Sequence, residues 1–186
     1  MEPIDTLNPP VDASDWIRSA LRRYEGPLVR YAFGITGDLE TARDIVQDTF
    51  LRLCSQDPAA LDGRLAPWLF TVCRRRALDV LRRSNRMTSL SETELENSID
   101  SGPPPDVATD TRDQTTVAMQ LLSLLPANQR EVVRLKFQSQ LSYEEIAAVT
   151  SLSVGNVGFL LHTALKTLRT RMAHLETCPP VASHRP

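Results

Sequence analysis

An acidic segment rich in Ser, Thr and Pro, residues 87–113, divides this chain of 186 residues into two parts. The segment carries seven acidic residues against a single Arg, and three consecutive prolines interrupt it. Its small apolar surface cannot offset the conformational entropy that it would lose on folding, so we expect a flexible linker. The chain is therefore expected to fold as two small domains, one on each side of the linker.

Both parts carry apolar residues at the 3.6-residue spacing of amphipathic helices, without strand-like alternation of useful length. Pro27 suits the first turn of a new helix, and Asp38 suits the cap of the next one. The helices expected in the first part cover residues 14–25, 27–36, 39–54 and 67–86. Those expected in the second part cover residues 114–125, 127–138, 142–149 and 153–173.

The sequence thus predicts an all-α fold of two small helical domains joined by a flexible acidic linker. The predicted boundaries give a first domain over residues 14–86 and a second over residues 114–174, which contains a helix-turn-helix. The two ends of the chain, residues 1–13 and 175–186, are expected to be disordered.

Charge is strongly segregated along the chain, although its net value is only −2. Residues 16–86 carry 13 Arg against 8 acidic residues, a net charge of +5, and residues 116–186 carry 7 basic against 4 acidic residues, a net charge of +3. Residues 87–115, between them, have a net charge of −6. Two basic domains separated by an acidic connector indicate two contacts with one polyanion, whereas scattered solvated faces are the plainer alternative.

Several classes of function lack support in the sequence. No apolar run approaches the roughly 20 residues that span a bilayer, and the N-terminus has no secretory signal, so we expect a cytoplasmic protein without membrane insertion. Cys54 and Cys73 fall in amphipathic patterns and are predicted to be core residues rather than disulfide or zinc partners. His162 has no partners at metal-ligand spacing, and no nucleophile–base pair or phosphate-binding loop occurs. We therefore expect no metal, no cofactor and no enzymatic activity.

The stretch "LSYEEIAAVTSLSVGNVGFLLHTALKTL" has the layout of a helix-turn-helix. Ser142 and Glu145 suit a capping box at its start, and a turn is expected around Thr150–Leu152. Ala147 is small enough for the two helices to cross closely. A DNA-binding unit is the sharper interpretation, and an amphipathic helical hairpin with no DNA role is the plainer one.

The second helix of this motif carries apolar residues where a recognition helix usually has cations. The spacing predicts a buried stripe of Val157, Leu161, Ala164, Leu165 and Leu168. A groove-facing Phe159 can contact a thymine methyl group, and Asn156 can pair with adenine. Gly158 would then allow the backbone to approach DNA closely. The alternative is that Phe159 and Leu160 bury against the helix at 127–138 or against a partner.

The first part contains a cluster of guanidinium groups in "CRRRALDVLRRSNR". These groups suit contacts with a phosphate backbone, and they belong to Arg74, Arg75, Arg76, Arg82 and Arg83. Trp68 and Phe70, at the start of the same helix, can stack on unpaired bases. Trp68 is equally suited to anchor the domain core, and both interpretations stay open.

Taken in order, four stretches of the chain resemble one known family. They are "YAFGITGDLETARDIVQDTFLRL", "PWLFTVCRRRALDVLRR", "LPANQREVVRLKF" and "LSYEEIAAVTSLSVGNV". They are similar to the two conserved domains of extracytoplasmic-function sigma factors, the promoter-recognition subunits of bacterial RNA polymerase, across about residues 16–172. The resemblance implies a first domain that melts and captures the promoter −10 element. It implies a second domain that binds the duplex −35 element, and dependence of both on core RNA polymerase.

The resemblance also implies roles for individual residues. Asp44, Gln47 and Asp48 stand at i, i+3 and i+4, on one helix face opposite the apolar stripe, and the resemblance implies that this face docks core polymerase. Contacts with the −10 element are implied for the Arg cluster and Trp68. Contacts with the −35 element are implied for Ser153, Asn156, Phe159, Leu160, Thr163, Lys166 and Arg169. Promoter DNA and an anti-sigma factor are the further partners that the resemblance implies.

Two departures from the family pattern bear on these roles. Arg75 stands where the family usually has an asparagine that captures a −10 base, and residues 158–160 replace the family's basic or small polar residues. A stand-alone helix-turn-helix regulator is the alternative function, and a protein-interaction module that no longer reads DNA is a third. The first domain separates them, because a regulator has no need of a docking face beside an Arg-rich melting helix.

Overall fold

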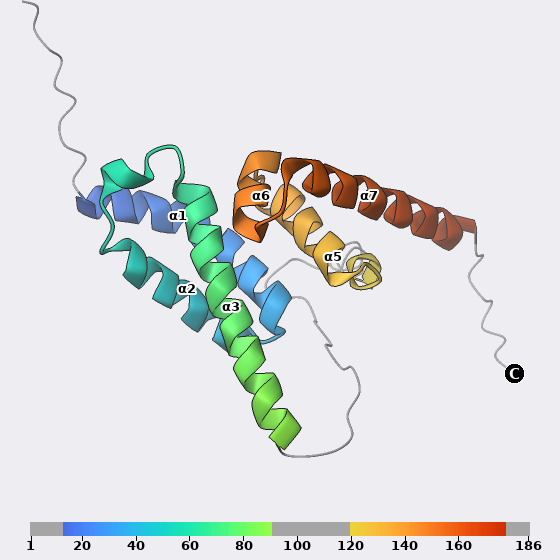
Figure 1. Ribbon diagram of the computed structural model, residues 1–186, viewed down its shortest axis with the longest axis horizontal. Coiled ribbons are helices and arrows are strands. Elements are labelled where there is room, and N and C mark those ends of the chain that lie inside the picture. Colours follow the sequence, from blue (N-terminus) through green and yellow to red (C-terminus); the bar gives the residue numbers. More distant parts are fainter. Residues whose placement is uncertain (1–12, 91–119, 178–186) are drawn as a thin grey trace, which may run out of the picture. The chain divides into compact units, whose positions relative to one another are not determined.

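The computed structural model of the chain describes residues 13–90 and 120–177, with side chains over 14–84 and 120–173. The chain divides into two compact units, Met1–Ile99 and Asp100–Pro186. Every regular element among the described residues is a helix (Figure 1). This confirms the predicted all-α fold of two helical domains. The predicted linker lies outside the described residues, apart from its positions 87–90.

The first unit contains three long helices and one short 3-10 helix in its described part. They are α1 (Ala13–Thr36), α2 (Leu39–Leu53), η1 (Pro58–Leu61) and α3 (Leu65–Leu90), and each long helix packs against the other two (Figure 1). Gly37 joins α1 to α2 with a φ of 74°, a conformation that glycine adopts at little cost. Asp38 then caps α2 by accepting a hydrogen bond of 2.7 Å from the Thr41 backbone N–H. Hydrogen bonds from the Thr41 side chain and backbone hold the pKa of Asp38 below its usual value.

The sequence predicts two helices over residues 14–36, but α1 runs unbroken through Pro27. The proline removes one backbone hydrogen bond from the helix interior, at a cost of about 3 kcal/mol in an exposed helix. The helix continues because residues on both sides of Pro27 enter the same core. Ala20 precedes the proline, Leu28 and Tyr31 follow it, and none of the three is more than 3% exposed. Tertiary packing therefore outweighs the local penalty.

An aromatic pair lies at the centre of the first unit. The rings of Tyr31 on α1 and Phe70 on α3 meet edge to face, with their centroids 5.4 Å apart. Both side chains are buried, so the interpretation of Phe70 as a base-stacking residue is wrong. Further large buried side chains come from all three helices: Leu28, Ile45, Val46, Phe50, Leu53 and Leu69.

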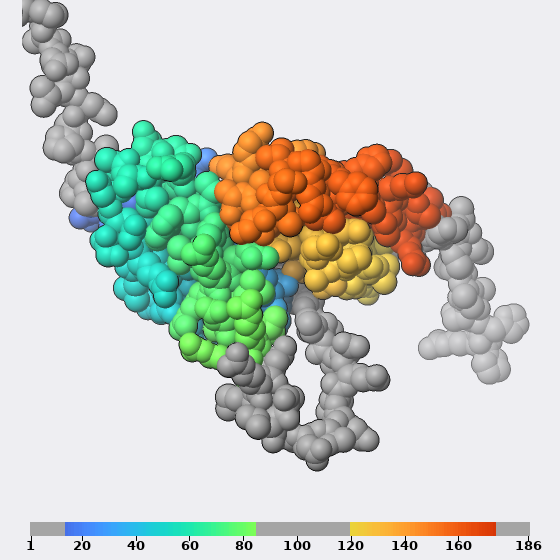
Figure 2. Space-filling view, in the orientation of Figure 1, coloured from blue at the N-terminus to red at the C-terminus, as the bar shows by residue number. Residues whose placement is uncertain are grey.

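α3 extends past the predicted end of its domain at residue 86 and ends at Leu90. No proline or glycine occurs between Arg86 and Gly102, so nothing in the local sequence stops the helix earlier. In the space-filling view, α3 (green) forms part of the molecular surface of the first unit (Figure 2). The predicted Arg cluster is therefore carried on one continuous, surface-lying helix.

The second unit begins, among the described residues, with a helical turn at 120–123. Its further elements are α5 (Ala127–Val133), the π-helical segment η2 (Arg134–Gln138), α6 (Tyr143–Thr150) and α7 (Val154–Thr177). α5 and η2 together cover the predicted helix 127–138. The Arg130 guanidinium fixes the turn before α5 by donating hydrogen bonds of 3.1 and 3.0 Å to the carbonyls of Ser123 and Leu125.

α6 and α7 form the helix-turn-helix that the sequence predicts. The Ser142 hydroxyl accepts a hydrogen bond of 3.1 Å from the Glu145 N–H, and the Glu145 carboxylate accepts one of 2.7 Å from the Ser142 N–H, which confirms the capping box. Ser151 ends α6 in the left-handed conformation, with a φ of 60°. The two helices then turn by 102°, within the range of about 90–120° typical of this motif.

No single helix in the described part of the chain has the length and apolar composition to cross a membrane. α6 and α7 meet that test only when taken together, and as a pair they are bent by 102°.

The buried face of α7 is rotated relative to the predicted one. Val157, Leu161 and Ala164 are buried as expected, and Leu160 joins them at 7% exposed. Leu165, which the spacing predicts to be buried, is 39% exposed. Because α5 and α6 both pack on α7, the side that they cover decides which residues enter the core, and that side includes Leu160.

The two cysteines predicted to lie in the core differ in exposure. Cys73 on α3 is buried as predicted, whereas Cys54, just after α2, is exposed, so its core assignment is wrong. Burial raises the pKa of the Cys73 thiol from 9.0 to about 12, and a hydrogen bond with Thr49 offsets the rise only in part. Cys73 therefore keeps its proton near neutral pH and presents no reactive thiolate.

Cys73 should be inert to thiol reagents in the folded protein, while Cys54 reacts. In a Cys178→Ser background, an aromatic disulfide reagent at about pH 8 should label Cys54 at once and Cys73 only when denaturant unfolds the first unit. Cys54→Ser is the control. Labelling of native Cys73 at the rate of Cys54 would contradict its burial.

The same thiol makes the first unit sensitive to alkali. Its pKa is raised on folding, so its contribution to stability is complete below the unfolded value of 9.0 and is lost as the pH rises toward about 12. Cys73→Ala should flatten the fall in the free energy of unfolding over that pH range, as measured by urea titration at each pH.

Candidate nucleic-acid and polymerase interface

The three residues predicted to dock core polymerase lie on α2 but differ in their surroundings. Asp44 and Gln47 are exposed, whereas Asp48 is half-buried and faces α3. Ile45 and Val46, between them in the sequence, are buried in the core. The three polar residues thus lie outside the core, as the helical spacing predicts. The spacing does not reveal that Asp48 is less exposed than Asp44 and Gln47.

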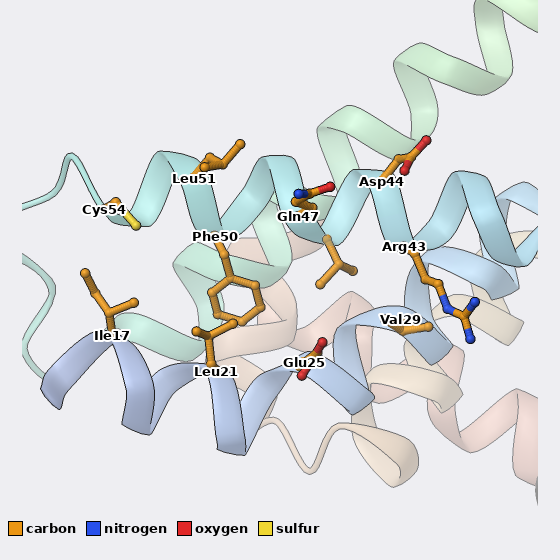
Figure 3. A pocket seen from close by; sticks show the side chains of 11 residues that line it. Ile17, Leu21, Glu25, Val29, Arg43, Asp44, Gln47, Phe50, Leu51 and Cys54 are labelled. Atoms are coloured by element: carbon orange, nitrogen blue, oxygen red, sulfur yellow. The ribbon is translucent and has the colours of Figure 1, made fainter. Parts of the chain in front are cut away.

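A groove of about 530 Å³ lies between α1 and α2, beside this surface (Figure 3). Figure 3 shows Leu21 of α1 opposite the ring of Phe50 on α2, and Ile17 of α1 farther along the groove, near Cys54. Asp44 and Gln47 also line the groove, on its α2 side. An apolar floor with a polar rim is the composition of a protein-docking surface.

Asp48 forms an ion pair with Arg76 on α3. The Nε and Nη2 atoms of Arg76 each lie 3.0 Å from Oδ2 of Asp48. The Arg76 side chain is 34% exposed and that of Asp48 is 43% exposed, so solvent reaches the pair. The pair joins two helices, unlike the pair between Arg82 and Asp79, which lies within α3. Arg76, which is predicted to contact DNA, and Asp48, which is predicted to contact polymerase, therefore contact each other.

The outer side of α3 carries a basic stripe. Trp68, Arg75 and Arg82 recur every seven residues, and such residues lie on nearly the same side of a helix. Arg75 and Arg82 are exposed, and Trp68 is half-buried. Arg83 is exposed beside the stripe, whereas Arg74 is half-buried and interacts within the chain. Exposed guanidinium groups along one helix can contact successive phosphates of a nucleic acid.

The outer face of α7 lies opposite its buried stripe. Gly155, Phe159, His162, Lys166 and Arg169 follow one another at helical spacing, and all five are exposed. Phe159 is 66% exposed, an unusual position for a large aromatic side chain. A Cβ placed on Gly155 would meet no atom within 4 Å, so the surface beside Phe159 is open. The face thus presents one apolar group followed by cations toward the C-terminus of the helix.

Three other residues predicted to read the −35 element have mixed positions. Asn156 is exposed, and Thr163 is half-buried. The Ser153 hydroxyl accepts a hydrogen bond of 3.2 Å from the Asn156 N–H, so Ser153 caps α7 whatever else it contacts. His162 is exposed on the same face as Phe159, as its spacing of three residues indicates, and its interpretation as a surface or phosphate-contacting residue stays a prediction.

Two residues of the predicted reading surface contact other parts of the second unit. Leu160 is buried in the core of the second unit, so the prediction that it faces DNA is wrong. Gly158 is half-buried, and a Cβ placed on it would lie 3.7 Å from Cε2 of Tyr143 on α6. The glycine therefore lies beside Tyr143 at the edge of the outer face, and the expectation that it admits a close approach of DNA stays a prediction.

The chemistry of these surfaces is that of binding. No group of three or more His, Cys, Asp or Glu side chains that could hold a metal ion occurs in the described ranges 14–84 and 120–173. Exposed guanidinium and ammonium groups suit phosphates, exposed carboxylates suit basic protein surfaces, and an exposed aromatic ring suits a base or an apolar partner.

Two family models match the chain, one in each unit. The model described as Sigma-70 region 2 matches residues 20–87, and the model described as Sigma-70, region 4, matches residues 116–168. The RNA polymerase sigma factor YlaC of Bacillus subtilis is 30% identical over 162 residues, which cover 85% of this chain and 92% of that protein. The ECF RNA polymerase sigma factor SigL of Mycobacterium tuberculosis is also 30% identical over 162 residues, which cover 86% and 90%, respectively.

Two solved structures share the fold. The sigma factor RpoE of Bartonella quintana, in complex with the anti-sigma factor NepR, is 24% identical with a TM-score of 0.63, and the match covers 86% of this chain and 98% of that one. CnrH, in complex with the cytosolic domain of CnrY, is 22% identical with a TM-score of 0.58, and the match covers 85% and 88%. At these identities the likeness concerns the fold.

Two adjacent residues of α7 should respond differently to truncation. Leu160→Ala removes a buried side chain and should lower the free energy of unfolding of the second unit by about 2–5 kcal/mol. Phe159→Ala removes an exposed one and should change it by no more than about 0.5 kcal/mol. Hydrogen exchange of the α7 amides at increasing urea concentration measures both. Equal losses would mean that Phe159 is packed in the full chain.

Proposed function

Because the chain belongs to the extracytoplasmic-function (ECF) family of RNA polymerase sigma factors, we propose a division of promoter recognition among its exposed surfaces. As a member of that family it directs promoter-specific transcription with core RNA polymerase. The proposed division rests on one observation: the unit matched by sigma region 2 exposes an acidic surface and a basic stripe, and the unit matched by sigma region 4 exposes the outer face of α7.

A stand-alone helix-turn-helix regulator is the alternative function. It would account for α6 and α7, but it gives no role to the first unit. The match to sigma region 2 over residues 20–87 therefore favours the sigma factor. We further propose that the protein acts in the cytoplasm, where promoter DNA is located, and that it performs no chemical step of its own.

Core polymerase is assigned to the α2 surface that carries Asp44, Gln47 and Asp48. Exposed carboxylates attract a basic partner and orient its approach. The groove between α1 and α2 supports the assignment, because it offers apolar area next to Asp44 and Gln47 that a partner can bury.

The promoter −10 element is assigned to the outer side of α3. Arg75, Arg82 and Arg83 have exposed guanidinium groups that can contact the backbone of the opened strand. Trp68 is half-buried, so part of its ring can stack on a base while the rest packs on the domain. Arg75 stands at the position of the family's usual asparagine, and its guanidinium can replace the amide by hydrogen bonding to a base edge or stacking on it.

The −35 element is assigned to the outer face of α7. Lys166 and Arg169 are exposed cations that can bind phosphates. Phe159 and Asn156, nearer the start of the helix, supply the base contacts: the ring suits a thymine methyl group, and the amide suits adenine. Such a helix reads A·T-rich sequence through apolar contact rather than guanine through arginine.

An anti-sigma factor is the further partner that we propose. RpoE of Bartonella quintana was solved with the anti-sigma factor NepR, and CnrH with the cytosolic domain of CnrY. The groove between α1 and α2 and the exposed ring of Phe159 are apolar surfaces on which a protein inhibitor could compete with polymerase or DNA.

Run-off transcription tests the function and the docking surface together. The full chain with core polymerase should initiate specific transcripts on genomic fragments. Asp44→Arg should lower their yield at limiting protein, because the variant binds core weakly, and excess protein should restore it. Asp62→Arg, the same change at an exposed position outside α2, is the control. If core polymerase alone gives the same transcripts, the proposed sigma-factor function is wrong. If Asp44→Arg binds core polymerase as tightly as wild type does, only the assignment of the docking surface is wrong.

Replacement of thymine by deoxyuracil in the −35 duplex tests the role of Phe159. The swap removes one methyl group and keeps the hydrogen bonds of the base pair. At the contacted position it should weaken promoter binding by the holoenzyme about fourfold, the effect of losing one buried methyl group of about 0.8 kcal/mol.

The Phe159→Ala holoenzyme should bind both duplexes equally, while His162→Ala should keep the fourfold difference. Sensitivity to the methyl group that survives in Phe159→Ala would assign the base contact to another residue.

A further inference from the structure

Asp48 and Arg76 contact each other across α2 and α3, and we propose that Arg76 is a positioning residue of the polymerase-docking surface. In this role it holds the Asp48 carboxylate in the orientation that polymerase binds, and it does not contact promoter DNA. The inference rests on the proposed docking surface, of which Asp48 is a part.

The geometry of the pair leaves Asp48 able to bind a second partner. Nε and Nη2 of Arg76 both lie 3.0 Å from the same oxygen, Oδ2. A guanidinium that pairs with a carboxylate in the common parallel arrangement occupies both oxygens, whereas this one occupies a single oxygen. Oδ1 has no hydrogen-bond partner among the described residues, and the side chain is 43% exposed. Arg76 thus fixes the carboxylate through one oxygen and leaves the other for a donor on polymerase.

The position of Arg76 on α3 argues against a DNA contact. It follows Arg75 directly, so its side chain leaves the helix about 100° away from the basic stripe. It is 34% exposed, against 70% for Arg82 on the stripe. Two of its nitrogens lie 3.0 Å from the Asp48 carboxylate, whereas Arg82 reaches Asp79 through one longer contact of 3.5 Å. A phosphate would have to displace the carboxylate, so Arg76 adds little to the attraction of a polyanion.

A role in stability alone does not account for the pair. Ion pairs that solvent reaches to this extent contribute little to the free energy of folding. Their effect on binding can be larger, because a side chain that is held in one rotamer before association loses less entropy on association. Asp44 and Gln47 are exposed on the same helix, and neither side chain is held by an ion pair or hydrogen bond to another described residue. Asp48 is therefore the pre-organised member of the docking surface.

Affinity of the full chain for core polymerase tests the inference in a set of matched variants. Asp48→Asn should weaken binding, and Arg76→Gln should weaken it about two- to tenfold, the loss expected when one side chain has to be ordered on binding. The double variant should bind no more weakly than Asp48→Asn alone, because Arg76 acts through Asp48. Arg82→Gln is the control: it should leave core affinity unchanged and make the salt dependence of open-complex formation shallower by about one unit of slope.

The charge-swapped variant, Asp48→Arg with Arg76→Asp, separates positioning from packing. The swap can re-form the ion pair, so its urea midpoint should stay closer to wild type than that of either single swap. Its core affinity should remain low, because polymerase then meets a guanidinium in place of a carboxylate.

Each contrary result has a distinct meaning. Unchanged core affinity in Arg76→Gln, with Asp48→Asn impaired, would overturn the positioning role and leave the docking surface standing. Unchanged core affinity in Asp48→Asn would overturn the docking surface itself. Recovery of core affinity in the charge swap would make the pair purely structural, and a salt slope in Arg76→Gln as shallow as in Arg82→Gln would return Arg76 to the DNA interface.

Discussion

Packing of α3 against α1 and α2 is the constraint on which the surfaces of the first unit depend. Leu69, Phe70, Cys73 and Ala77 are buried, and the edge-to-face contact of Phe70 with Tyr31 fixes how α3 is rotated about its axis. A helix that buries one side has to present the opposite side to its surroundings. The residues that hold the unit together thus decide which arginines are available to a nucleic acid and which one turns toward α2.

Features that depend on a few neighbouring residues could be predicted from the sequence. The capping box of Ser142 and Glu145 and the Asp38 cap of α2 are examples, because each is set by spacing within about one helical turn. Features that depend on packing against a neighbouring helix could not be predicted from the sequence. Pro27 stays inside α1, and Leu160 is buried while Leu165 is exposed, because packing between helices outweighs local preference and selects one edge of an ambiguous stripe.

The contacts within the candidate site also depend on packing between helices, so the sequence alone could not predict all of them. Helical spacing identified the polar surface of α2 and the Arg-rich helix, but it could not reveal that Asp48 and Arg76 meet, since 28 positions separate them in the chain. Sequence patterns assign a residue to a surface from its own helix alone. Where two helices cross, a side chain of one helix can form part of the surface of the other. A substitution of Arg76 in α3 can therefore alter the binding surface of α2.

The outer face of α7 can change in sequence during evolution without loss of the fold. Phe159, His162 and Lys166 are exposed on a helix whose hold on the second unit comes from the opposite side, through residues such as Val157 and Leu161. Substitutions on the outer face therefore change the free energy of folding little. Substitutions in the core more often lower stability below the level that function requires, and selection removes them. After a gene duplication, two copies could accumulate different residues there while both remain folded, and each could come to serve a different set of promoters.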